Sequence, residues 1–434
     1  MTRFVAGGLF LLIAAPAFAQ DAAPEWKYGA RIEIRANWRD SKEAKIPLKF
    51  PFPPSFLPVG QTVGFEETVN SGRHTELSVA QIKLDASYGH LFTAHSQFHL
   101  QDKYRRNPTS EDRKTDIDEA WIRFGQNPSF LERPTGTSFF AQLGKQPHME
   151  RQPIRLLESY GLASTAFNRF EDVQAIVGGS VGRNFYWRLV GANGNPLFFR
   201  DPNALAGDNG IKELLQPNPD PRLKSGFPIL YNAETEDYFF NNRHFQFGQA
   251  LGYRWQNDAQ SFGFDAIAFH YRRKMVFEDH LTGTFYGAEI DLLDGPDGFG
   301  TSLPIHGNMK QETGARVYIE WGKLTSTMQY TKQTAAGLGR QGWEGEFGYR
   351  IELAGGSSLT PVFRASGMTN DFRAKSDKRY PAPSVWWPWT KFDYGVRIGF
   401  PKNTDVTIEH AKHNIGAPIK VRPDETLVTL RIRI

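Results

Sequence analysis

The stretch that decides the fold is the last one in the chain, Thr426-Leu-Val-Thr-Leu-Arg-Ile-Arg-Ile434. Its residues alternate in character, because every second side chain from Val428 to Ile434 is apolar while Thr429, Arg431 and Arg433 lie between them. Successive side chains of a β-strand point to opposite faces, so this alternation predicts a strand with one apolar and one polar face.

The same alternation recurs along the whole chain. The first such segment, Tyr28–Trp38, carries apolar residues at even positions, with Arg31, Glu33, Arg35 and Asn37 between them. With the two terminal segments the total is sixteen, and the others lie at residues 80–88, 92–100, 120–124, 139–143, 173–177, 185–189, 245–255, 262–266, 315–321, 324–330, 343–351, 359–366, 392–400 and 406–408.

The connections between these segments are alternately short and long. Short ones lie at 89–90, 178–184, 256–260, 322–323, 354–357 and 401–403, and long ones at 39–74, 101–116, 146–170, 194–242, 274–312, 367–390 and 413–424. The connection at 333–341 is a short loop at the end where the other loops are long. The connection at 125–137 is long although it lies at the end where the other turns are short. Short turns at one end and long loops at the other are typical of transmembrane β-barrels. We therefore predict an all-β, antiparallel transmembrane barrel of sixteen strands, with both termini periplasmic. Eighteen strands are the alternative, because Phe285–Leu293 also has strand character.

The beginning of the chain has the pattern of a secretory signal peptide. Arg3 is followed by an apolar run and by Ala17-Phe18-Ala19, so residues 1–19 are expected to be removed and residues 20–434 to form the barrel. The aromatic content of 14% and the mean hydropathy of −0.48 suit a barrel with a wet interior. The expected location is the bacterial outer membrane, with its lipids and lipopolysaccharide as partners. A net charge of +4 without a Lys/Arg block gives no sign of nucleic-acid binding.

A sixteen-stranded barrel is too wide for side chains to fill, so its expected function is diffusion of small hydrophilic solutes. Arginines outnumber acids on the inward faces, which predicts a preference for anions. Residues 145–172 mix leucine and aromatic residues with arginines, and we expect this connection to fold into the lumen and narrow it. The predicted constriction and selectivity residues are Lys145, Arg151, Arg155, Arg169, Arg31, Arg35, Arg123, Arg431 and Arg433.

Short motifs between residues 75 and 195 resemble a known family. Asp118-Glu119-Ala120-Trp121-Ile122, Gly144-Lys145-Gln146-Pro147, Met149-Glu150-Arg151 and Asn168-Arg169-Phe170 are similar to the phosphate-selective (O/P-type) porins of Gram-negative outer membranes. A weaker resemblance is to alginate-export barrels, which have eighteen strands and an Arg-rich lumen. The first resemblance implies a channel whose third external loop forms the constriction.

Other functions remain open at this point. The proline- and aromatic-rich stretches 46–58 and 380–389 could select sugars or aromatic solutes, or pack together as a lid, and a barrel plugged by its own loops would be structural. An enzyme is not expected, because no H-E-x-x-H motif occurs and His95 and His99 are expected to be wall residues. Cofactors and metals are not expected, since Asp291–Gly298 lacks the spacing of a calcium loop. General porins are often homotrimers, and the same assembly is an expectation here.

Overall fold

The computed structural model describes residues 24–42, 45–47, 65–67, 72–102, 115–128, 136–168, 171–192, 246–274, 309–335, 338–371, 388–416, 422 and 424–434. The predicted signal peptide, Arg169, the segment Phe285–Leu293 and most of the two proline-rich stretches lie outside these residues. None of the helices in the described part is long and apolar enough to cross a bilayer.

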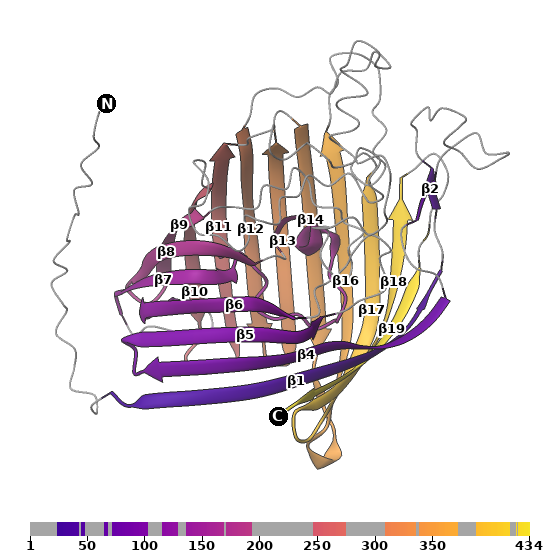
Figure 1. Ribbon diagram of the computed structural model, residues 1–434, viewed down its shortest axis with the longest axis horizontal. Helices are drawn as coiled ribbons and strands as arrows, with labels where there is room; N and C mark the ends of the chain where they lie inside the picture. Colours follow the sequence, from indigo (N-terminus) through magenta and orange to yellow (C-terminus); the bar gives the residue numbers. More distant parts are fainter. Residues whose placement is uncertain are drawn as a thin grey trace, which may run out of the picture.

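The described strands form one closed antiparallel barrel (Figure 1). Each strand pairs with its neighbours along the chain, and the first pairs with the last through Glu33 opposite Arg433 and Ser41 opposite Glu425. The strands are β1 (Trp26–Ser41), β4 (Gly72–Tyr88), β5 (Phe92–Asp102), β6 (Asp116–Gly125), β7 (Ser138–Pro147), β8 (Glu171–Val181), β9 (Phe185–Ala192), β10 (Gln246–Gln256), β11 (Phe262–Lys274), β12 (Met309–Trp321), β13 (Leu324–Ala335), β14 (Leu338–Tyr349), β15 (Ile351–Glu352), β16 (Ser358–Asp371), β17 (Trp389–Phe400), β18 (Thr404–Ile415) and β19 (Glu425–Arg433).

The barrel has sixteen strands, because β14 and β15 are one strand interrupted at Arg350 and both pair with β16. Every predicted segment is a strand, so the predicted fold class is confirmed and the eighteen-stranded alternative is wrong. A separate hairpin, β2 (Lys45–Pro47) with β3 (Phe65–Glu67), lies in the connection between β1 and β4. Most connections of the short-turn end are tight, although the one between β6 and β7 spans residues 126–137. At the turn between β12 and β13, Trp321 pairs with Leu324, and Gly322 between them has a φ of 57°, which suits a glycine.

The predicted loop at 333–341 is wrong. Strand β13 continues to Ala335 and β14 begins at Leu338, so only two residues lie between them. Thr334 pairs with Gly339, and Lys332 with Gln341, in a part of the ladder where polar side chains stand on the outer face. The apolar alternation marks the part of a strand that faces lipid, whereas the hydrogen-bonded ladder extends beyond it.

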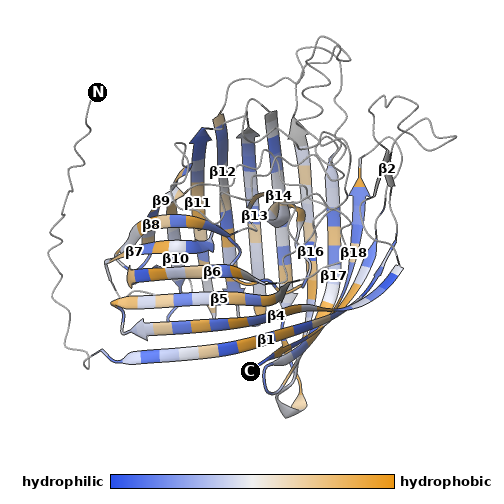
Figure 2. Ribbon diagram, in the orientation of Figure 1, coloured by the Kyte–Doolittle hydropathy of each residue, from blue (hydrophilic) through white to orange (hydrophobic). Residues whose placement is uncertain are grey.

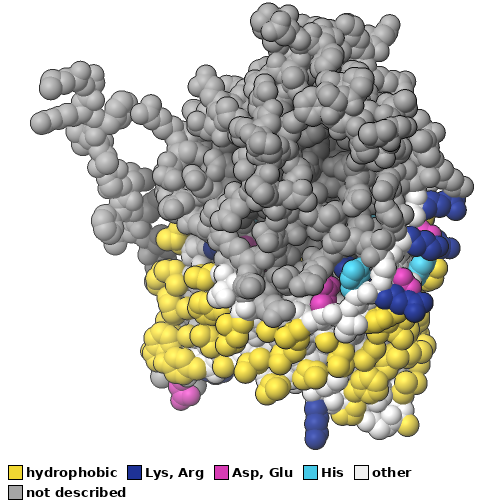
Figure 3. Space-filling view, turned by 45° about the vertical axis from the view of Figure 1, so that its right-hand side comes forward, with side chains coloured by type: hydrophobic (Ala, Val, Ile, Leu, Met, Phe, Trp, Pro, Cys, Tyr) yellow, Lys and Arg dark blue, Asp and Glu magenta, His cyan; other side chains and the backbone are white. Residues whose placement is uncertain are grey.

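Apolar side chains are exposed at the outward positions of the strands, and we call them the outer belt. Figure 2 shows hydrophobic and hydrophilic residues interspersed along the strands, and Figure 3 shows the apolar side chains as a band on one face of the molecule. In cross-strand register, Ile34 lies opposite Ile432, and Trp38 opposite Val428, which in turn lies opposite Ile408. At the short-turn end the belt is rich in aromatic rings, including the exposed Phe124, Trp255, Trp321 and Phe400. Exposed apolar area of this extent is stable only where lipid covers it.

The inside of the barrel is not polar throughout. On strands β7–β11 a group of inward side chains forms a buried cluster, the inner apolar cluster, made of Phe140, Ile176, Tyr186, Val190, Ala192, Ala250, Ile267, Phe269 and Tyr271, together with Met149 from the connection after β7. Glycines opposite the rings make room for them, since a Cβ at Gly248 would lie 2.5 Å from the ring of Tyr271. This side of the lumen is therefore closed by packing.

Candidate functional site

The connection between β7 and β8 is fixed against the inner wall of the barrel. We call residues 148–168 the lumen segment; it ends in a short π-helix, Ser164–Asn168. Its backbone and side chains bond to inward residues of β11, β12, β14, β16, β17, β18, β19 and β1, so it crosses the interior rather than standing away from the barrel.

Strand β14 provides two carboxylates that bind the lumen segment. Glu344 accepts hydrogen bonds from the backbone N–H of Ser164 at 2.9 Å and from its hydroxyl at 3.0 Å. Glu346 accepts one from the N–H of Leu156 at 2.8 Å. These bonds satisfy backbone donors that would otherwise be buried without partners, which is why they hold the segment firmly.

Glycines on the same inward face of β14 provide the space for apolar side chains. A Cβ at Gly342 would lie 2.7 Å from the ring of Phe167, and a Cβ at Gly348 would collide with the side chain of Leu156. On the inward face of β14, two glutamates that bind backbone N–H groups thus lie between two glycines that make room for apolar side chains.

The middle of the segment is held by β16, β17 and β18. Arg364 donates to the carbonyl oxygen and the hydroxyl of Ser159, each at 2.7 Å, and Glu409 accepts from the N–H of Ser159 at 2.8 Å and of Glu158 at 2.7 Å. Lys391 donates to the carbonyl oxygen of Tyr160 at 2.7 Å. All three wall residues are buried, so their charged groups interact with the lumen segment and with one another rather than with water.

Glu158 is the point at which the segment reaches the closing strands. Its carboxylate accepts from Arg35 of β1 at 2.7 Å and from Arg431 of β19 at 2.6 Å, and Arg155 lies 3.9 Å away. Burial alone would raise the pKa of Glu158, but the three arginines outweigh it and hold this pKa well below its usual range. The carboxylate therefore stays ionised at any pH near neutrality. Three predicted site residues, Arg35, Arg155 and Arg431, meet here.

The remaining predicted residues lie apart from this centre. Arg151 forms an ion pair with Glu171, and Arg31 pairs with Asp85 at 3.0 Å. The others are Arg433, which pairs with Glu33 at 2.9 Å and Asp405 at 3.2 Å, Arg123, which donates to Thr93 at 3.3 Å, and Lys145, which is half-buried on β7. By register Lys145 lies opposite Ala120 and Val173, in the outward-facing row of β7. Alternation indicated that Arg31, Arg123 and Arg433 face inward, but it did not show which groups they contact.

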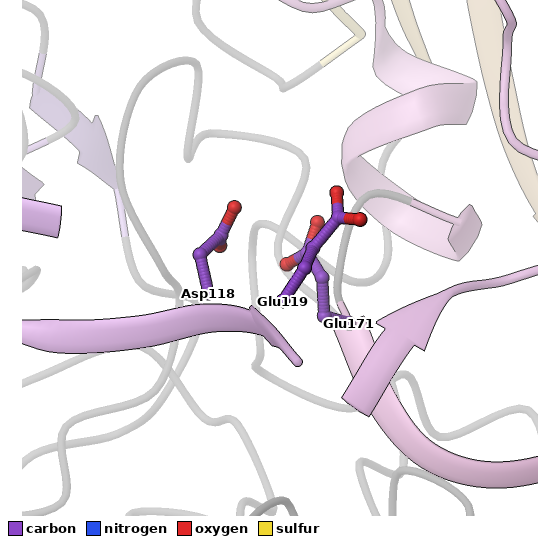
Figure 4. Close-up of side chains that lie close together, drawn as sticks. All are labelled: Asp118, Glu119 and Glu171. Atoms are coloured by element: carbon purple, nitrogen blue, oxygen red, sulfur yellow. The ribbon is translucent and has the colours of Figure 1, made fainter. Parts of the chain in front are cut away.

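An acidic group faces the lumen segment from β6 and β8. Oxygens of Asp118, Glu119 and Glu171 lie within 4.8 Å of one another (Figure 4). Arg151 of the lumen segment pairs with one of the three, Glu171, so the group already has a cationic partner. His95 of the neighbouring strand contacts Asp85 at 2.7 Å and stacks on Trp121, which places it in the wall.

His148 begins the lumen segment in a buried and acidic environment. Its ring lies 3.4 Å from Glu150 and 4.0 Å from Asp172, and 5.1 Å from the ring of Tyr271. Burial lowers the pKa of His148, but Glu150, Asp172 and Glu312 together outweigh burial, so this pKa is raised above its ordinary value.

Comparison with known proteins identifies the fold but no relative in sequence. No protein-family model matches the chain, and no curated protein matches it. Among solved structures, the outer-membrane channel DcaP of Acinetobacter baumannii is similar with a TM-score of 0.51 and 7% identity, over 96% of this chain and 99% of that one. OprB of Pseudomonas putida is similar with a TM-score of 0.52 and 8% identity, over 94% of both chains. The fold is thus that of outer-membrane channels, and with the outer belt it places the chain in the bacterial outer membrane.

Proposed function

We propose that this chain is a porin, through which small hydrophilic solutes diffuse along a water-filled passage beside the lumen segment. The observation that carries the proposal is the one-sided attachment of that segment. The segment is bonded to β8, β9, β11–β14, β16–β19 and β1, whereas the remaining wall of β4–β6 keeps inward charged side chains that water reaches. Asp85, for example, has a side-chain exposure of 34% although it faces inward.

The proposal includes a preference for anions, and the relative exposure of paired charges supports it. In the ion pairs described above that involve a predicted arginine, the arginine side chain is more exposed than its acid. Arg151 is 27% exposed against 13% for Glu171, and Arg155 is 20% exposed against 1% for Glu158. A solute in the passage therefore meets guanidinium groups before carboxylates, and guanidinium donors suit carboxylate and phosphate oxygens. Phosphate is one candidate within this class.

The test is single-channel recording in planar bilayers with a potassium chloride gradient. We expect the conductance to rise in single-channel steps, and we expect the sign of the reversal potential to show that chloride permeates more readily than potassium. Silence at all voltages would show that the barrel is plugged and would overturn the proposal, whereas conducting steps with a cation-side reversal potential would overturn only the anion preference. The proposal also includes assembly as a homotrimer, which a mass measurement in detergent checks.

A further inference from the structure

The connection between β6 and β7 is the long one at the short-turn end, and its first residues turn into the barrel. We call residues 126–128 the inner turn. It follows Gly125, whose φ of 82° is one that glycine adopts readily and other residues rarely do, so the chain changes direction where β6 ends. Pro128 is buried although it belongs to a connection at the end of the barrel. The inner turn therefore packs against the interior.

The inner turn contacts an arginine that is three strands away. Gly125 at the end of β6 and Arg188 of β9 lie in one cross-strand row, which passes through β7 and β8. Three strand spacings amount to about 14 Å along the wall. Arg188 nevertheless donates hydrogen bonds to the side-chain oxygen of Asn127 at 3.2 Å and to the carbonyl oxygen of Pro128 at 2.7 Å. Because Arg188 is on the inward face of β9, the inner turn runs toward β9 inside the wall.

The same guanidinium group also binds the lumen segment. Its other terminal nitrogen donates to the carbonyl oxygen of Met149 at 3.1 Å, and the side chain is buried. Among the described residues, the acceptors of Arg188 are neutral oxygens, and no carboxylate lies within ion-pair distance of it. A buried cation that loses an acceptor carries the full cost of the unmade bond. The inner turn and the lumen segment therefore share one cation, and each helps to satisfy it.

We propose that Arg188 couples the inner turn to the start of the lumen segment, so that displacing either one loosens the other. While the inner turn is in place, its two oxygens hold the guanidinium fork in the orientation that reaches Met149. When the inner turn leaves, the guanidinium group keeps only the carbonyl oxygen of Met149 and moves toward water at the short-turn end. Coupling through a shared contact is reciprocal, because one free energy links the two positions.

This coupling gives the barrel a control point at the short-turn end. An event that moves the inner turn would change the position of a segment that lies inside the lumen. The inference goes beyond the proposed function, because it concerns how the segment is held and does not depend on what crosses the lumen.

The other contacts of the lumen segment make the expected effect local. At its start, Tyr271 donates to Glu150 at 2.8 Å. Arg316 donates to the carbonyl oxygen of Arg151 at 2.7 Å. The far end is held separately by the carboxylates of β14. Loss of the contact with Arg188 should therefore loosen residues 148–151 and leave the π-helix of the segment in place.

The experiment is thiol labelling of the folded, full-length barrel in detergent, because the chain has no cysteine of its own. The reporters are M149C at the start of the segment and A163C at its end, both at buried positions that react only when exposed. The test variant is N127G/P128G, which removes the amide oxygen and the fixed φ of proline. The matched control is N257G/D258G, which loosens another turn of the same end, between β10 and β11.

A hydrogen bond to a charged group changes an equilibrium by on the order of 10-fold, so N127G/P128G should raise the labelling rate of M149C about 10-fold. Labelling of A163C should stay unchanged, and the control variant should change neither reporter. In an R188Q background the two glycines should have no further effect, since glutamine cannot bind the inner turn and the segment together. An unchanged rate at M149C in N127G/P128G would overturn the proposal, and so would a full effect in R188Q.

The reverse direction separates coupling from the loosening of one connection. Y271F removes the hydroxyl that binds Glu150 and keeps the ring, so a reporter at P128C should label faster in Y271F, but not in Y271F/R188Q. No change at P128C in Y271F would contradict the coupling. If R188Q does not fold, R188K replaces it, because an ammonium group lacks the planar fork of donors. These measurements need no conduction, so coupling found in a silent barrel would contradict the proposed function alone.

Discussion

Replacing Glu158 with glutamine is expected to release the lumen segment from the closing strands. The carboxylate is buried, and it is the group that joins Arg35 and Arg431 to the segment, at 2.7 Å and 2.6 Å. An amide has no charge and only one acceptor oxygen, so at least one guanidinium would lose its partner. The exchange changes the volume of the side chain very little, and it therefore tests the charge rather than the packing.

The free-energy cost of E158Q depends on which acidic partners Arg35 and Arg431 retain. Breaking a buried ion pair costs about 3–5 kcal/mol. Arg35 retains Glu33, and Arg431 retains Asp405 at 3.7 Å, so we take the lower end of that range. About 3 kcal/mol shifts the equilibrium between the bound and displaced segment by roughly 100-fold, because each ten-fold change corresponds to about 1.4 kcal/mol.

The absence of cysteine from the chain makes the measurement direct. A single cysteine introduced at Ala163, which is 1% exposed in the segment, reacts with a water-soluble thiol reagent only when the segment is displaced. We expect E158Q to raise the labelling rate of A163C by roughly 100-fold. The control is E352Q, at an exposed ion pair with Arg350 in the short-turn end. An unchanged labelling rate in E158Q/A163C would refute the assignment of Glu158 as an anchor of the segment.

Four further outcomes are expected. Replacing Arg151 and Arg155 with alanine should raise single-channel conductance and move the reversal potential toward cations; no change in either would place both residues outside the passage. Gly348→Leu should raise the A163C labelling rate, because its side chain takes the space of Leu156, whereas the same exchange at Gly191 of β9, where an added Cβ meets no atom within 4 Å, should not. His148 has a raised pKa, so protonated His148 stabilises the bound segment fully below pH 6.5 and this contribution is lost as pH rises through the raised pKa; because thiol reagents react with the thiolate, labelling rises with pH in every variant, and it should rise more steeply in A163C than in H148A/A163C. Unboiled and boiled samples should migrate differently in gels, because a closed barrel has no free edge from which to unfold; equal migration would contradict the barrel.

The strands were predictable because their signal is local. Each strand shows the alternation of apolar and polar residues within its own segment, as in Thr426–Ile434. The alternation of short and long connections then predicted a closed barrel with an even number of strands. What local pattern could not give is where each strand stops. The ladder between β13 and β14 continues through polar residues such as Lys332 and Gln341, where neither face is apolar. A strand that crosses a bilayer needs about 9–11 residues, and several here are longer.

The site was predictable by residue type but not by partner. Arg35 and Arg431 were expected to face inward from the register alone. Their shared partner, Glu158, lies 273 residues before Arg431, and no local pattern connects residues so far apart. The inner apolar cluster could have been predicted from a feature of the sequence other than alternation. Phe139-Phe140 and Phe185-Tyr186-Trp187 are consecutive aromatic residues, which indicates strands covered on both faces.

The position of Glu158 also has a consequence for the order of assembly. Its two arginine partners come from the first strand and the last, so its binding site exists only after β1 and β19 have paired. Before that moment the carboxylate of Glu158 lacks a complete pair of guanidinium partners, although the backbone of the segment can already bond to Glu409 of β18 and Arg364 of β16. The lumen segment therefore reaches its full protection from thiol reagents and proteases only in a chain whose barrel has closed. Protection of position 163 can thus serve as a measure of completed folding, independent of any transport assay.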